Sequence, residues 1–180
     1  MSVSQIKTTA NKELIELANR NSHLADLYDI QFSTPPSDGR LPDANKENTY
    51  DIDLTTRTIQ APEFLSVEKD HKATVIYFKV DRYFDYMDLA NTICLVEYLP
   101  PAFDKKRVPY MYVVPIFDTN SYVLDNKIVF PWVLGNPATQ EDGIIEYAIR
   151  FFRLSDETAE PKIVYDLRTL PAQSKILKGL

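Results

Sequence analysis

The chain has 180 residues, of which 44% are hydrophobic and 26% are charged, and its net charge is −6 at pH 7. This length suits one domain with a short appendage, and the composition is globular rather than disordered. An acidic chain is poorly suited to neutralising phosphates, so we expect no nucleic-acid partner. No apolar run approaches the length of a membrane span, so we expect no membrane partner.

Three further features bear on compartment and fold class. The first residues lack the apolar core of a signal peptide, and the single cysteine, Cys94, excludes an internal disulfide framework. Both fit synthesis in a reducing cytoplasm. The 11 tyrosines and 9 phenylalanines favour strands, while 12 prolines against 4 glycines leave turns to Pro, Asn and Asp.

Residues 1–48 differ from the rest of the chain. Helix formers place Leu14, Leu17 and Ala18 on one stripe, with Leu24 and Leu27 further along, so we predict a short helix. The following "FSTPPSDGRLPDANKEN" has the composition of an extended linker. We therefore predict an N-terminal arm that packs on another chain or back on its own domain.

Residues 49–168 change to short strand-like runs separated by turns. Their alternation and spacing predict a mainly β domain, an antiparallel β-sandwich of about seven strands. The connections are too short for crossover helices, so a parallel sheet is not expected. The predicted strands are 50–62, 73–80, 92–99, 110–117, 126–134, 143–154 and 161–167. Pro115 and Pro131 lie inside two of these runs and predict edge positions or bulges, and residues 137–143 and 155–161 read as exposed loops.

The last residues, 169–180, follow a break at Pro171 and read as a basic tail with apolar residues. The tail is too short to form a core of its own, so it is either solvated or docked on a neighbouring chain. We predict that Ile176, Leu177 and Leu180 in this tail bind a partner, together with Leu14, Leu17 and Leu24 of the arm.

The stretch "KVDRYFDYMDLAN" (79–91) crowds acids and aromatics together after a predicted strand. One interpretation is a sugar-binding surface, with Tyr83 and Tyr86 stacking on a glycan. The other, which we prefer, is a structural corner. In that interpretation Asp81, Asp85 and Asp88 bind backbone amides while Phe84 and Leu89 face the core.

Catalytic and metal-binding patterns are weak in this sequence. The only histidines are His23 and His71, Cys94 lies in an apolar run, and no GxSxG, HExxH or P-loop motif occurs. The acids at 81, 85 and 88 and the acids of "VEKDH" do not match the spacing of a calcium loop. We therefore predict no catalytic residues, no metal and no cofactor; a hydrolase with paired carboxylates remains an alternative without a specific pattern.

Four segments carry a resemblance to a known family. They are "ATVIYFKVDRYFDYMDLAN", "YVVPIFDTNSYVLDNKIVFPWVLG", "IIEYAIRFFRL" and "IVYDLRTLPAQSKILKGL". Over about residues 49–180 the chain resembles a module of structural proteins from bacteriophages that infect Gram-positive gut bacteria. More loosely, it is similar to the N-terminal sandwich of upper baseplate proteins.

The resemblance implies a non-enzymatic virion protein, made in the host cytoplasm and built into the capsid, tail or baseplate. Its implied partners are other virion proteins and copies of itself, with a host-surface glycan as a further candidate. Where such a module precedes a fibre the chain continues, whereas this sequence stops at Leu180, which favours a connector or decoration subunit. The alternative function is a carbohydrate-binding module for host recognition.

Overall fold

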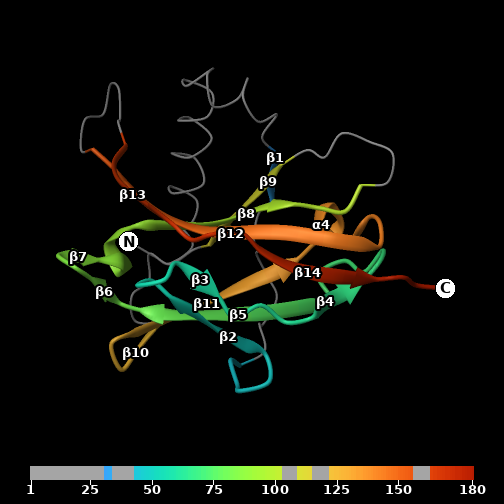
Figure 1. Ribbon diagram of the computed structural model, residues 1–180, viewed down its shortest axis with the longest axis horizontal. Coiled ribbons are helices and arrows are strands. Elements are labelled where there is room, and N and C mark those ends of the chain that lie inside the picture. Colours follow the sequence, from blue (N-terminus) through green and yellow to red (C-terminus); the bar gives the residue numbers. More distant parts are fainter. Residues whose placement is uncertain (1–30, 34–42, 103–108, 115–121, 156–162) are drawn as a thin grey trace, which may run out of the picture.

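The computed structural model describes residues 31–33, 43–102, 109–114, 122–155 and 163–180. Within these ranges the chain is mainly β, as the sequence predicts, with a seven-stranded sheet, a five-stranded sheet and one two-stranded hairpin. Figure 1 shows the two larger sheets as layers, with the seven-stranded sheet uppermost in the view. Most of the predicted arm, including Leu14, Leu17 and Leu24, lies outside the described residues.

The seven-stranded sheet is built around one long central strand, β12. Its main path follows the order β1 (Gln31–Ser33), β9 (Tyr110–Val114), β8 (Ile93–Leu99), β12 (Gly143–Leu154), β14 (Ala172–Leu177) and β4 (Phe64–Val67). The seventh strand, β13 (Ile163–Arg168), pairs with the second half of β12, while β14 pairs with its first half. The observed bounds of β12 are those predicted from its period-two pattern.

The five-stranded sheet has the order β10 (Val123–Leu124), β11 (Lys127–Leu134), β5 (Thr74–Asp81), β2 (Thr49–Asp53) and β3 (Thr58–Ile59). A two-stranded hairpin, β6 (Tyr83–Phe84) and β7 (Met87–Asp88), follows β5 and leads into the short 3-10 helix η1 (Leu89–Asn91). A single helical turn, α4 (Asn136–Thr139), connects β11 to β12. The predicted strand 50–62 is therefore two strands joined by a tight turn, in which Arg57 has φ 62°.

The core lies between the two large sheets and contains the faces that alternation predicts. Ile76, Phe78 and Val80 of β5 are buried, and so are the odd-numbered residues of β12 from Ile145 to Phe151. Aromatic rings join the layers: the ring centroids of Trp132 and Tyr147, from opposite sheets, are 5.3 Å apart. Offset aromatic pairs of this kind add to the stabilisation from burial alone.

The sheets are mixed rather than purely antiparallel, which corrects the sequence prediction. β1 pairs with β9, β4 with β14, and β2 with β5, all in parallel. The prediction assumed that parallel neighbours need a helical crossover. Here the chain leaving β2 runs through β4 in the other sheet before it returns as β5, so the opposite layer supplies the crossover.

The predicted C-terminal tail is a strand of the fold, and this is a second correction. Thr169 bridges the interruption between β13 and β14, since its N–H donates to the Ile149 carbonyl and its Oγ1 accepts from the Ile149 N–H, both at 2.9 Å. After Pro171, β14 inserts between β12 and β4. Residues 172–177 therefore pair along both sides within their own sheet, with Ser174 and Ile176 buried, rather than forming a separate tail.

The predictions for Pro131 and for the loop 137–143 have different outcomes. Pro131 lies in β11 beyond the two residues that pair with β10, so within the described part of the chain that side of Pro131 is a sheet edge, as predicted. The predicted exposed loop 137–143 instead begins in α4, where Ala138 and Thr139 are fully buried. Pro137 suits the first turn of a helix, where an amide hydrogen has no intrahelical acceptor. Pro115 and nearly all of the loop 155–161 lie outside the described residues.

Candidate functional site

The corner at residues 79–91 is held by an ion pair between Arg82 and Asp88. Arg82 Nε and Nη2 donate to the two carboxylate oxygens of Asp88, each at 3.0 Å. The same carboxylate accepts from the Ala90 N–H at 3.1 Å and so caps η1. The hydrogen bond from Arg82, with the Ala90 amide, holds the pKa of Asp88 below its usual value. Leu89 is fully buried and Phe84 packs against the core, as the structural interpretation predicts.

Within the described part of the chain, no backbone amide donates to the other two acids of this corner, which corrects the prediction for them. Asp81 forms an ion pair with Lys127, its partner across β5 and β11. Asp85 lies in the turn of the β6–β7 hairpin with φ 52°, a left-handed conformation that Asp tolerates better than most residues. Only Asp88 of the three has the predicted capping role.

The two tyrosines predicted to contact a glycan are both exposed near the tip of this hairpin. Tyr86 is 87% exposed and Tyr83 is 54% exposed. The Arg82 guanidinium lies 5.2 Å from the centroid of the Tyr83 ring and occupies one of its faces. Tyr165 lies close enough for Tyr86 and Asp85 to add to the rise in its pKa, which burial mainly causes. The tip therefore presents one open ring, Tyr86, and one ring with an occupied face.

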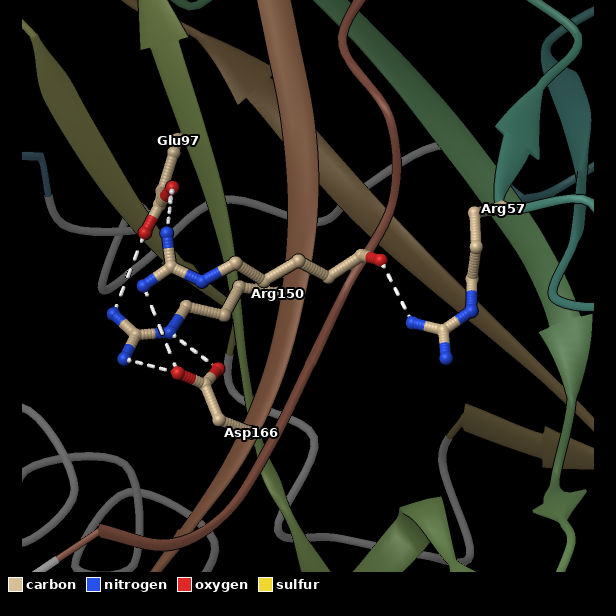
Figure 2. A network of polar contacts seen from close by, with 5 residues as sticks. Arg57, Glu97, Arg150 and Asp166 are labelled. Atoms are coloured by element: carbon tan, nitrogen blue, oxygen red, sulfur yellow. Dashed lines mark hydrogen bonds and ion pairs between the residues drawn. The ribbon is translucent and has the colours of Figure 1, made fainter.

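A network of four charged residues crosses three strands of the seven-stranded sheet, on the face turned away from the five-stranded sheet. We call this face the outer face. Arg150 on β12 donates from Nε and Nη2 to the two Asp166 oxygens at 2.8 and 3.0 Å, and from Nη1 to Glu97 at 3.4 Å (Figure 2). Arg168 reaches both acids, at 3.5 Å to Glu97 and 3.6 Å to Asp166.

The Arg150 side chain is the buried centre of this network. It is 6% exposed, and its guanidinium lies 4.9 Å from the centroid of the Phe152 ring. Two guanidinium groups and two carboxylates balance in charge, so the network fixes the register of β8, β12 and β13 without forming a charged pocket. The carbonyl of Arg168 also accepts a hydrogen bond from Arg57 Nη1 at 3.0 Å (Figure 2), which links this sheet to the β2–β3 turn.

Exposed apolar side chains gather at the other end of the outer face, near the C-terminus. Ile144 and Phe64 flank Lys175 in the strand register, and Val67 pairs with Leu177. We call this set the C-terminal patch: Phe64, Val67, Ile144 and Leu177, which are 55%, 37%, 42% and 38% exposed. Figure 1 places the β6–β7 hairpin and the C-terminus at opposite ends of the long axis of the molecule.

The residues predicted to bind a partner through the tail therefore have different positions. Leu177 belongs to the C-terminal patch, and Leu180 is fully exposed beyond it. Ile176 is 2% exposed and packs in the core of its own chain, so its predicted partner contact is wrong. The alternation within β14 explains the difference, because neighbouring residues of a strand point to opposite faces.

Cys94 and His71, two of the groups considered for catalysis, are held in structural positions, and His23 lies outside the described residues. Cys94 is completely buried, and burial raises the pKa of its thiol well above the usual value, which disfavours the reactive thiolate. His71 Nδ1 accepts a hydrogen bond from the Asn136 N–H at 3.0 Å at the start of α4. Among the described residues there is no group of three His, Cys, Asp or Glu side chains placed to hold a metal ion.

Sequence reasoning missed both the charge network and the C-terminal patch. Alternation along 143–154 puts Arg150 on the face opposite Ile149 and Phe151, but its partners Glu97 and Asp166 become neighbours only through strand pairing. Phe64 and Val67 were missed because the strand β4 is only four residues long. A detectable pattern was the apolar pair Phe64 and Leu65, which closely follows Pro62.

Comparison with known proteins assigns no family. No protein-family model matches the sequence, and no curated protein matches it. Within the described residues no helix is long and apolar enough to cross a membrane. Function is therefore inferred from the contacts above and from the resemblance of the sequence motifs.

Proposed function

We propose that the protein is a non-enzymatic virion structural protein of a bacteriophage, a multi-copy connector or decoration subunit. Its two packed sheets are best classed as a β-sandwich, with an N-terminal helical and extended arm. The observation that carries this proposal is the C-terminal patch. Exposed apolar side chains that gather on one face of a sheet are typical of a protein–protein contact surface.

The positions of the motifs that resemble phage structural modules support this proposal. The "RYFD…DL" motif builds the Arg82–Asp88 corner, and the "KI.FPW" motif is β11, which places Phe130 and Trp132 in the core. The motif at the end of the chain supplies β13 and β14. The motifs therefore supply an ion-paired corner, core side chains and paired strands. These are structural roles, which suit a scaffold protein.

The proposed occupant of the C-terminal patch is a second copy of this chain. A two-fold contact needs a surface that complements itself. The patch includes charges of both signs, since Lys175 lies between Ile144 and Phe64 and its Nζ is 4.0 Å from Glu63. The four-residue strand β4 is the last strand of its sheet within the described residues, so a neighbouring copy could approach it from the side.

The proposal is tested in particles. Mass spectrometry of purified virions from the host phage should detect the protein at a fixed multiple of the other structural proteins. Deleting residues 1–25 should leave the fluorescence of buried Trp132 native while removing the protein from particles. Normal incorporation of the truncated chain would reject the proposed role of the arm, and absence of the full-length chain from virions would reject the function.

A second candidate function, binding a host-surface glycan, is favoured by the exposure of Tyr83 and Tyr86 at one hairpin tip. An open tyrosine ring can stack on a sugar, and the neighbouring Asp85 carboxylate can accept hydrogen bonds from hydroxyl groups. Titration with host wall polysaccharide tests this. Binding that is lost in Tyr86→Ala and retained in Tyr86→Phe, which keeps the ring, would favour this function; no binding by the intact chain would remove it.

A further inference from the structure

The outer face of the seven-stranded sheet carries a second apolar cluster that is separate from the main core. We call it the outer cluster: Ile93, Leu95, Met111, Val113 and Phe152. Cys94 and Val96 on β8, Tyr112 and Val114 on β9, and Phe151 on β12 face the main core. Because side chains alternate along a strand, the outer cluster points away from the five-stranded sheet.

The side chains of the outer cluster are as buried as those of the main core. Its five members are between 0% and 7% exposed. On the same face of the same sheet, Ile144 and Leu177 are 42% and 38% exposed. Lying on this face is therefore not enough to bury a side chain, and the outer cluster requires a cover. Every member of the cluster, with its partly buried neighbour Ile163, belongs to the seven-stranded sheet itself, so none of the described elements outside that sheet contributes to it.

The N-terminal segment of the chain has the length and the starting point that this cover needs. The cluster spans the three neighbouring strands β9, β8 and β12, about 10 Å across at the usual strand spacing, which is close to the width of one helix. The internal ranges outside the described residues contain at most nine residues, whereas residues 1–30 precede β1. β1 is the edge strand beside β9, and Phe32 pairs with Met111 of the outer cluster.

We propose that the outer cluster is the binding surface for the N-terminal segment of the same chain, residues 1–30. The apolar stripe predicted there, formed by Leu14, Leu17 and Ala18 and continued by Leu24 and Leu27, supplies the complementary face. The buried Arg150 beside Phe152 gains from the same cover, because excluding water strengthens its bonds to Asp166 and Glu97. In the free subunit the arm is then stored on its own sheet rather than held out in solvent.

Site-specific photo-crosslinking of the full chain tests this inference. A benzophenone amino acid at Leu17 should, in dilute solution, crosslink within the monomer to peptides containing Ile93–Leu95, Met111–Val113 or Phe152. The same group at Asn19, which lies off the predicted stripe, should crosslink to these peptides at least several-fold less. Crosslinks from position 17 to other peptides, equal crosslinking from position 19, or products of dimer mass would overturn the proposal.

A matched pair of double substitutions adds an independent measurement. L14D/L17D should increase the binding of a hydrophobic dye by uncovering the outer cluster. T8D/N19D adds the same two negative charges at polar positions off the predicted stripe and should leave dye binding unchanged. Fluorescence of Trp132, which lies in the main core, reports whether the fold survives. Unchanged dye binding by a folded L14D/L17D variant would contradict the inference. If that variant unfolds, the crosslink decides.

None of these outcomes depends on where the protein lies in a virion, so they test the covering of the outer cluster separately from the proposed function.

Discussion

At the scale of single residues, the polar side chains with the most contacts act as ties between segments. Asp88 joins the Arg82 guanidinium to the Ala90 amide of η1, and Arg150 joins two carboxylates from the strands on either side of β12. These contacts explain why the stretch 79–91, crowded with acids and aromatics, is mainly a corner of the fold. Its exposed tyrosines are the part that remains available to a ligand.

The Asp88 carboxylate should contribute stability that depends on pH. Its pKa in the folded state is lowered by Arg82, so its contribution is present above the usual value near 3.8 and is lost as pH falls below it. Asp88→Asn keeps a capping oxygen but removes the charge, and it should cost about 1 kcal/mol at pH 7 for such a partly exposed pair. Urea unfolding at pH 7 and pH 3 measures this. A difference between the two proteins that is equally large at pH 3 would contradict the assignment.

The Arg150 network gives a second prediction at this scale. Arg150→Met leaves Glu97 and Asp166 facing one another, and because Arg150 is 6% exposed the loss should be about 2–3 kcal/mol. Arg168→Met removes the other cation, which is 48% exposed, and should cost less than about 1 kcal/mol. Chemical unfolding of both variants compares them. Equal losses would show that burial does not determine the contribution of each arginine.

At the scale of elements, the long alternating strands could be predicted and their neighbours could not. The bounds of β12 and the buried face of β5 follow from the alternation of apolar residues along each strand. This alternation can be read from the strand's own sequence. The strand β14 was missed because Ala172–Leu177 offers only three apolar residues, and its stability comes from hydrogen bonds to β12 and β4. The corner at 79–91 was recognised, but which acid capped a helix depended on the position of Lys127 in another strand.

The last strand should therefore be essential for folding. Deleting residues 172–180 removes the strand between β12 and β4, and we expect the chain to lose its cooperative unfolding transition. Ile176→Ala, at a 2% exposed position, should cost about 2–4 kcal/mol, whereas Leu180→Ala on the surface should change stability by less than about 0.5 kcal/mol. Urea denaturation followed by Trp132 fluorescence measures all three. A native transition in the truncated chain would restore the solvated-tail interpretation.

At the scale of the whole molecule, the seven-stranded sheet has one inner face and an outer face that is divided in two. The inner face packs on the five-stranded sheet. One part of the outer face is a buried apolar cluster beside a neutral charge network, and the other is the exposed C-terminal patch. No local pattern in the sequence distinguishes these two parts, because both contain alternating apolar residues. They differ in what lies above them, which only the folded chain decides.

Self-association through the C-terminal patch is the expected consequence of this division. Leu177→Asp places a charge in the centre of the patch at a 38% exposed position, so it should weaken association of the purified chain while leaving its fold intact. Leu124→Asp adds the same charge on β10, at a 66% exposed position in the other sheet, and should leave association unchanged. Sedimentation velocity over a range of concentrations measures both variants against the parent chain.

An interface of standard size buries about 800 Å² on each partner, and a contact of that size should be detectable at micromolar concentration. Equal behaviour of the two variants would exclude the patch as the contact between copies, because a general effect of added charge would act on both.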